Sequence, residues 1–360
     1  MSVEALIEAV AVDGRRLTHR EALNLFECDD LAILGLGADR VCNRLHPENI
    51  RTYVIDRNIN YTNVCVSGCR FCAFFRAPGS PDAYVLTHEQ VLARVEEAVQ
   101  LGATQILMQG GLHPDLPLSY YTGLLKAIRS QFGVHLHCFS PPEIVHICRV
   151  SGLSIRKVLE QFREAGLDSL PGGGAEVLSD DVRKRVSPDK CSTEEWLEVM
   201  RAVADIDMRA TATMMFGHVE SSEDRIEHLL RIRKLQDETN VFTAFIPWTY
   251  QSGNTALGGL TLGAHEYLKT LAVSRLVLDN IPNIQASWVT QGLAIAQVAL
   301  RFGANDLGST MIEENVVAAT GLSFGATTGD LRRNIKAAGF TPAQRDTQYR
   351  IITNGDTPLC

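Results

Sequence analysis

The feature that most constrains the fold is an alternation of short apolar runs with helical stretches, which begins near residue 50. Apolar runs bounded by turn residues are typical of parallel strands covered on both faces, and their alternation with helices indicates βα units. Eight such units occur over about 250 residues, the usual length of a barrel of this kind. We therefore predict an α/β fold, a TIM-type (β/α)8 barrel, with strands at 52–57, 105–108, 135–139, 167–170, 209–216, 241–248, 284–288 and 304–307.

Two further segments flank the predicted barrel. Residues 1–49 are predicted to be an N-terminal helical extension, in which Thr18-x-x-Glu21 has the pattern of a capping box. Residues 50–308 are predicted to form the barrel core. Residues 309–360 are predicted to form a C-terminal helical extension packed on the barrel, with helices near 313–320 and 330–338. No linker, tandem repeat or low-complexity tract divides the chain, so we expect one catalytic domain with terminal extensions.

Charge and composition argue against several classes of protein. The formal net charge is -8, so a broad basic surface for nucleic acid is not expected. The longest apolar runs fall short of the roughly 18 residues that a membrane-spanning helix needs. The first ten residues carry acidic side chains where a signal peptide needs basic ones. Nine cysteines, an odd number, fit a reducing compartment better than a disulfide framework, so we expect a cytoplasmic protein.

Three cysteines, Cys65, Cys69 and Cys72, lie within eight residues just after the first predicted strand. Their spacing supplies three metal ligands and no fourth nearby, whereas structural zinc sites and electron-carrying 4Fe-4S clusters use four protein ligands. Three thiolates on a four-iron cube leave one iron open, which suits a cluster that binds a substrate. Phe71 beside them would help to exclude water. The alternative is that the three are unrelated small buried residues.

This triplet resembles the signature of the radical S-adenosylmethionine (SAM) family. The resemblance implies a 4Fe-4S cluster held by Cys65, Cys69 and Cys72. It also implies that SAM binds the open iron and is consumed as a co-substrate, giving a 5'-deoxyadenosyl radical. An electron donor such as flavodoxin or ferredoxin is implied as a partner.

Loops that follow other predicted strands supply candidate SAM contacts, because the site of such a barrel is built at that end. Gly110 and Gly111 resemble a family turn whose backbone takes the SAM amino group, although Leu112 stands where the family often has Glu. The segment 213–220 resembles a family pattern that lies against adenine, with its Gly and Glu matched. Ser140 and Glu176 are placed to meet the ribose or methionine end of SAM, and ordinary turn capping is the alternative for each. The candidate cofactor-binding residues are Phe71, Gly110, Gly111, Ser140, Glu176, Gly217 and Glu220.

Candidate catalytic residues are those that could accept a proton or hold an anionic substrate. His113 and His218 lie in rim loops, and histidine is the usual proton acceptor near neutral pH. Arg57 lies just ahead of the cysteines and is a candidate for an anionic group, with a salt bridge beneath the loop as the alternative. His135 and His137 share one strand face, where packing inside the barrel is favoured over a role as a base.

Four segments carry a closer resemblance within the family, namely 58–65, 108–111, 171–176 and 246–259. They resemble the radical SAM enzymes that cyclise dehypoxanthine futalosine on the futalosine route to menaquinone. This implies abstraction of a ribose hydrogen, ring closure onto the benzoate, and loss of one electron and one proton. The alternatives within the family are aminofutalosine synthase and the deazaflavin-cofactor synthase subunits. Outside it, a non-catalytic iron–sulfur carrier and a zinc-bearing structural protein stay open.

Overall fold

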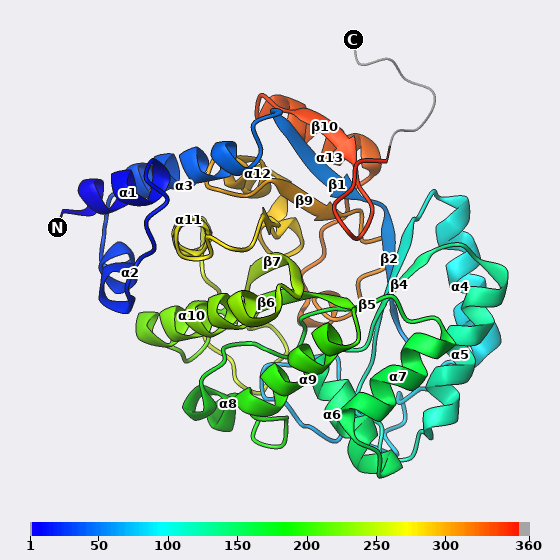
Figure 1. Ribbon diagram of the computed structural model, residues 1–360. Helices are drawn as coiled ribbons and strands as arrows, with labels where there is room; N and C mark the ends of the chain where they lie inside the picture. Colours follow the sequence, from blue (N-terminus) through cyan, green and yellow to red (C-terminus); the bar gives the residue numbers. More distant parts are fainter. Residues whose placement is uncertain (1, 353–360) are drawn as a thin grey trace.

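Parallel strands form the centre of the molecule, and helices cover them on the outside (Figure 1). The computed structural model describes residues 2–352. Its strands are β1 (Ile50–Val54), β2 (Asp56–Asn60), β3 (Gln105–Gln109), β4 (His135–Cys138), β5 (Ser169–Leu170), β6 (Arg209–Phe216), β7 (Phe242–Thr249), β8 (Asn283–Ile284), β9 (Asp306–Ser309) and β10 (Thr341–Gln344).

Strand pairing closes the sheet into a barrel. Strands β2 to β8 form a seven-stranded parallel sheet, and β10, β1 and β9 form a second sheet of three strands. Only Ile55 separates β1 from β2, so the two are successive parts of one extended segment. On the opposite edge, Gln285 after β8 forms a parallel bridge with Asp306 in β9. The two sheets therefore join around one interior, and the predicted α/β barrel is confirmed.

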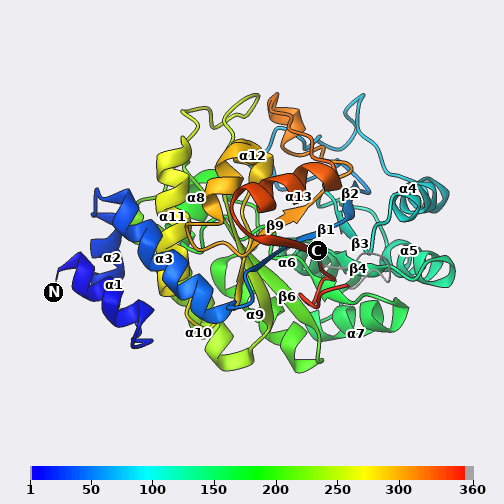
Figure 2. The same cartoon turned by 90° about the horizontal axis from the view of Figure 1, so that it is seen from above.

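The helices surround this barrel, as the view from above shows (Figure 2). Several of their starts follow from local sequence, because the capping box predicted at Thr18 begins α2 and capping boxes at Thr87 and Ser192 begin α4 and α9. The helices are α1 (Val3–Ala11), α2 (His19–Phe26), α3 (Leu31–Leu45), α4 (His88–Gln100), α5 (Leu118–Gln131), α6 (Pro141–Ser151), α7 (Ile155–Ala165), α8 (Asp180–Val186), α9 (Thr193–Asp205), α10 (Ser222–Thr239), α11 (Ala264–Val277), α12 (Trp288–Ala299) and α13 (Thr328–Ala337).

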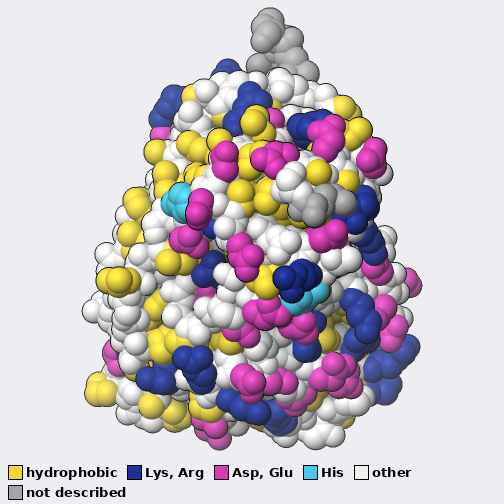
Figure 3. All heavy atoms as spheres, turned by 90° about the vertical axis from the view of Figure 1, so that its left-hand side faces the viewer, with side chains coloured by type: hydrophobic (Ala, Val, Ile, Leu, Met, Phe, Trp, Pro, Cys, Tyr) yellow, Lys and Arg dark blue, Asp and Glu magenta, His cyan; other side chains and the backbone are white. Residues whose placement is uncertain are grey.

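The N-terminal helices pack on one side of the barrel. Helix α3 lies against α1 and α11, and α2 lies against α10 and α11. On the face that carries these helices, Lys and Arg side chains are interspersed with Asp and Glu, so this face has no broad basic surface (Figure 3). Within residues 2–352, no helix combines the length and the apolar character needed to cross a membrane.

The C-terminal part differs from the predicted pair of helices. Only a 3-10 turn at Ala318–Thr320 forms within the first predicted helix, while α13 corresponds to the second. Strand β10 was not predicted, and it pairs in parallel with β1 along Ile50–Tyr53. The seventh predicted strand is also shorter than expected, because α12 begins at Trp288. The tail thus adds a strand to the barrel wall and brings its last described residues to the N-terminal ends of the strands.

Candidate active site

A cavity of about 270 Å³ lies inside the barrel. Polar side chains from β2, β3, β4 and β6 line one side of it, and Trp248 of β7 supplies an aromatic wall. Among the polar lining residues are Asn58, Gln109, His137 and Thr213. At the end where the strands begin, Arg345 closes the cavity and forms a buried ion pair with Asp306, with Nε 2.6 Å from Oδ2. The volume is just below the usual range for pockets that hold small molecules.

The three cysteines lie in the loop that joins β2 to α4, at the opposite end of the barrel. Backbone hydrogen bonds fasten this loop: Cys65 N donates to Arg76 O at 2.9 Å, and Val66 N donates to Leu112 O at 3.0 Å. A tight turn follows, in which Cys72 N donates to Cys69 O at 3.1 Å. These hydrogen bonds fix the backbone conformation of the cysteine loop. They hold the thiols between the turn after β3 and the other loops at this end of the barrel.

Of the three cysteines, Cys69 is buried, while Cys65 and Cys72 are half-buried. Burial raises the pKa of the Cys69 thiol to about 11, and burial also raises the pKa of Cys72. Thiolate is the form that binds metal, so binding of a cluster would have to displace these protons. The other cysteines of the described part of the chain lie in α3, β4 and α6, after α2 and before α9, and none belongs to this loop. Cys360 lies outside the described residues.

The donor set of the cysteine loop is three thiols. Among residues 2–352, no three His, Cys, Asp or Glu side chains lie close enough together to hold one metal ion. Ligands of one ion all lie within about 2.3 Å of it, whereas thiolates on different irons of a cube lie farther apart. A four-iron cube with one open corner takes three thiolates, which is the number that the loop supplies.

The turn after β3 packs directly on the cysteine loop. A Cβ atom at Gly111 would lie 2.1 Å from the carbonyl oxygen of Val64 and 2.9 Å from Cβ of Cys65. At Gly110 it would lie 2.5 Å from the Tyr61 ring. Both positions therefore require glycine, and they bring β3 backbone beside the first thiol.

Glu143, a buried residue behind this turn, was not identified as a site residue from the sequence. Glu143 accepts hydrogen bonds from Gly110 N at 3.0 Å and from Tyr61 Oη at 2.7 Å. It also accepts from the backbone and hydroxyl of Ser140, in the capping box that starts α6. Burial raises the pKa of Glu143. Ser140 is therefore engaged as a cap, and Glu143 orients the turn after β3.

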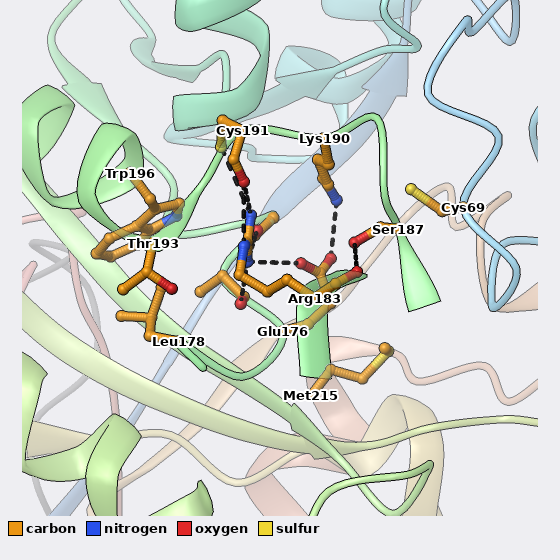
Figure 4. Close-up of polar contacts among 12 residues, drawn as sticks. Cys69, Glu176, Leu178, Arg183, Ser187, Lys190, Cys191, Thr193, Trp196 and Met215 are labelled. Atoms are coloured by element: carbon orange, nitrogen blue, oxygen red, sulfur yellow. Dashed lines mark hydrogen bonds and ion pairs between the residues drawn. The ribbon is translucent and has the colours of Figure 1, made fainter. Parts of the chain in front are cut away.

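Glu176 lies between two basic side chains (Figure 4). Its Oε1 accepts a hydrogen bond from Lys190 Nζ at 2.9 Å, while an Arg183 nitrogen lies 3.6 Å from Oε2. Oε2 is buried and has no hydrogen-bond partner among the described residues. Lys190 lies 5.4 Å from the centre of the Phe71 ring, and Cys69 lies on the same side of the carboxylate. The oxygen on the side of Lys190 and Cys69 is thus Oε1, which Lys190 holds, while Oε2 faces Arg183.

The segment Gly217–Glu220 forms a turn in which the Glu220 side chain binds the backbone N–H groups of the preceding residues. Glu220 accepts hydrogen bonds from Gly217 N at 2.6 Å and His218 N at 2.9 Å, and it pairs with Arg225. Gly217 has a φ of 94°, and a Cβ there would meet Leu262 at 2.6 Å. The close approach and the positive φ explain the glycine.

His218 and Arg57 do not take the places expected of catalytic residues. The His218 side chain is fully covered; Nδ1 accepts from Val219 N, Nε2 donates to Met215 O, and burial lowers its pKa. Arg57 faces α4, where it forms ion pairs with Glu97 and Glu313. The salt bridge is thus what the structure shows at Arg57, because alternate residues of β2 point outward.

His113 lies in the loop after β3. Its Nδ1 accepts a hydrogen bond from Asp115 N at 3.1 Å, and its carbonyl is paired with His146. It does not line the cavity. None of the three residues proposed as catalytic therefore reaches the interior, whereas the cysteines, Gly110, Gly111 and Glu176 gather at one part of the rim.

Sequence reasoning missed most of the cavity lining. Residues at alternate positions of β2, β3, β4 and β6 turn polar side chains inward. Parallel strands covered on both faces are normally apolar, so polar residues at period-two positions were the available signal. The contribution of Arg345 had no comparable signal, because it lies far along the chain from the strands that it meets.

Two family models match adjoining parts of the chain. The radical SAM superfamily matches residues 59–232, and the CofH/MqnC C-terminal region matches residues 239–357. Cyclic dehypoxanthine futalosine synthase of Halalkalibacterium halodurans is 48% identical over 98% of this chain and 95% of its own length. The enzyme of that name in Streptomyces coelicolor is 42% identical, covering 97% and 88%. The 5-amino-6-(D-ribitylamino)uracil--L-tyrosine 4-hydroxyphenyl transferase of Methanopyrus kandleri is 44% identical over 84% of each chain.

Two solved structures share the fold. Methylornithine synthase has a TM-score of 0.73 at 18% identity, covering 95% of this chain and 97% of that one. The FeFe-hydrogenase maturase HydG from Carboxydothermus hydrogenoformans has a TM-score of 0.78 at 16% identity, covering 97% and 80%. At this level of identity the likeness concerns the fold alone.

Proposed function

We propose that this chain converts dehypoxanthine futalosine into the cyclic product. The chain belongs to the radical SAM superfamily and, within it, to the group of cyclic dehypoxanthine futalosine synthases and related transferases. The observation that carries the proposal is the 48% identity to such a synthase over 98% of the chain. Relatedness of this extent includes both the cysteine loop and the C-terminal region that completes the cavity.

Membership of the family implies a 4Fe-4S cluster and SAM. We assign Cys65, Cys69 and Cys72 as the ligands that would hold the cluster. When bound, the cluster and SAM supply a 5'-deoxyadenosyl radical. The fastened loop would keep the three sulfurs in place, and the neighbouring rings would keep water away, which tunes a cluster and protects a radical.

SAM would lie on the rim beside the cysteine loop and the turn after β3. Glycine at 110 and 111 lets that turn pack closely on the loop, and Glu143 holds the turn. The Glu176 carboxylate, whose Oε2 has no hydrogen-bond partner among the described residues, would accept a hydrogen bond from the ribose or the amino group of SAM. Gly217 and Glu220 would shape the wall against adenine.

The cavity would hold dehypoxanthine futalosine with its ribose toward the cysteine end. The residues of this chain would orient the ribose C4' hydrogen toward the radical and exclude water and other hydrogen donors. In balance, substrate and SAM give cyclic product, 5'-deoxyadenosine, methionine and one proton. The electron that starts the reaction, from a donor such as flavodoxin or ferredoxin, is returned when the ring regains aromaticity.

The test is anaerobic turnover of the reconstituted protein with SAM, a strong reductant and dehypoxanthine futalosine, followed by mass spectrometry. We expect a product that is two hydrogens lighter than the substrate, formed together with deoxyadenosine. The control is Cys69→Ala, which should form neither, because the cluster loses one of three protein ligands. Deoxyadenosine without a cyclised product would contradict the assigned substrate.

A second candidate is favoured by the 44% identity to the Methanopyrus kandleri transferase. That activity would join 5-amino-6-(D-ribitylamino)uracil to a fragment of tyrosine. The same assay with these two compounds distinguishes the candidates, because the transferase product would carry a 4-hydroxyphenyl group and no futalosine would be consumed.

A further inference from the structure

Two histidines of β4 meet at one serine of β5. The two strands pair with His137 opposite Ser169. His137 Nδ1 and His135 Nε2 each lie 2.7 Å from Ser169 Oγ. Since residues two apart on a strand share a face, both rings turn toward the same hydroxyl. The three groups form an unbroken chain of hydrogen bonds.

One end of this chain faces the cavity. His137 lines the cavity, and its Nε2 has only a long contact of 3.4 Å with Thr211 Oγ1. Good hydrogen bonds of this kind are about 2.7–3.2 Å long, so Nε2 is available to a bound molecule. His137 is 6% exposed, which leaves the cavity as its route to a ligand.

The other end approaches the surface where the strands begin. His135 is the first residue of β4 and is half-buried. Charged groups surround it, since its titration is influenced by Asp168, Arg129, Asp346 and Arg350. Arg129 lies in the last turn of α5, Asp168 just before β5, and Asp346 and Arg350 in the C-terminal segment. His135 is half-buried near these charged groups, so a proton that arrives there can leave to solvent.

We propose that His137 accepts the proton that the cyclised substrate loses, and that Ser169 and His135 pass it to solvent. The proposal rests on the proposed function and adds a catalytic residue to it. After ring closure, the attacked carbon of the benzoate ring carries a hydrogen, and the ring holds an unpaired electron. The cluster, when bound in its oxidised form, would accept the one electron that the ring must lose. The C–H bond then breaks, its electron pair completes the aromatic ring, and the proton goes to Nε2 of His137.

The transfer needs only a shift of hydrogens along the existing bonds. His137 gives its Nδ1 proton to Ser169 Oγ, Ser169 gives its own to His135 Nε2, and His135 loses one from Nδ1 at the barrel end. Burial, with His135 and Arg345, lowers the pKa of His137 to about 3. His137 is therefore neutral at rest and passes a proton on rather than keeping it. A weak base suffices, because a cation that regains aromaticity is a strong acid.

The alternative is that one serine merely satisfies two packed histidines. Ser169→Ala distinguishes the two, because it breaks the chain and leaves His137 at the cavity. We expect deoxyadenosine to form within about twofold of the wild-type rate while cyclic product per deoxyadenosine falls about tenfold. Ser169→Thr, which keeps the hydroxyl, should restore the yield. The matched control is Ser274→Ala, which removes a buried hydroxyl in α11 that bonds only Thr270 O.

A second variant tests the base itself. His137→Ala should show the same loss of product yield, and added imidazole should restore it by entering the cavity. Unchanged yield in Ser169→Ala, equal loss of deoxyadenosine and product, or His137→Ala that imidazole does not restore would each overturn the relay. Wild-type protein that forms no cyclic product would overturn the proposed function and the relay together, whereas the other outcomes overturn the relay alone.

Discussion

Replacing Gly111 by alanine should disturb the cysteine loop without removing any ligand. The new Cβ would lie 2.1 Å from the carbonyl oxygen of Val64, and it must move by about 0.9 Å to reach the 3.0 Å limit of real contacts. The obstacle is backbone rather than a flexible side chain. Overpacking of this kind costs about 1–3 kcal/mol, and a displacement near 1 Å at a reaction centre can cost about 100-fold in rate.

The assay compares Gly111→Ala with Gly133→Ala, whose added Cβ would meet nothing within 4 Å. Thermal unfolding of the protein without cluster should show the loss of 1–3 kcal/mol only for the first variant. After anaerobic reconstitution, iron content and the change of the cluster EPR signal on addition of SAM should both fall in that variant. The reasoning would be refuted if Gly111→Ala matched Gly133→Ala in stability, SAM response and turnover.

Three further predictions concern buried ionisable side chains. Glu176→Gln keeps the shape of the side chain but removes its negative charge, so SAM should bind about tenfold more weakly by equilibrium dialysis. Unchanged affinity would exclude contact between Glu176 and SAM. Arg345→Met leaves Asp306 buried without its ion-pair partner, so the free energy of unfolding in denaturant should fall by about 3–5 kcal/mol. The double variant Arg345→Met with Asp306→Asn should recover part of this loss. Burial lowers the pKa values of His137 and His228 to about 3, so between pH 6.5 and 3 the unfolded chain binds protons that the folded chain does not. The free energy of unfolding should therefore fall as the pH is lowered through this range, and a free energy that does not change with pH there would contradict the argument.

The fold was largely predictable because its signals are local. All eight predicted strands have a counterpart, and the capping boxes mark helix starts, since both depend on neighbours a few residues away. The failures lie where long-range pairing decides. Strand β10 has no distinctive sequence, and it exists because β1 offers it an edge. The predicted helix at 313–320 is mostly lost to a segment in which Glu313 pairs with Arg57.

The site divides in the same way. The cysteine spacing and the glycines of the rim can be recognised in the chain, because a ligand loop and a close turn need those residue types locally. The sequence indicated Arg57, His113 and His218 as candidate catalytic residues. In the structure, each of these side chains makes its contacts outside the cavity. Which face of a strand points inward depends on register, and a one-residue shift exchanges the two faces.

By itself, the sequence determined the alternation of strands and helices, the three adjacent thiols and the family to which they belong. Only the tertiary structure decided which distant residues meet: Lys190 with Glu176, Arg345 with Asp306, and His137 with Ser169. The physical reason is that a side chain's type and local backbone are set by its neighbours along the chain. Its partners, burial and charge environment are set by the pairing of strands that lie far apart in sequence.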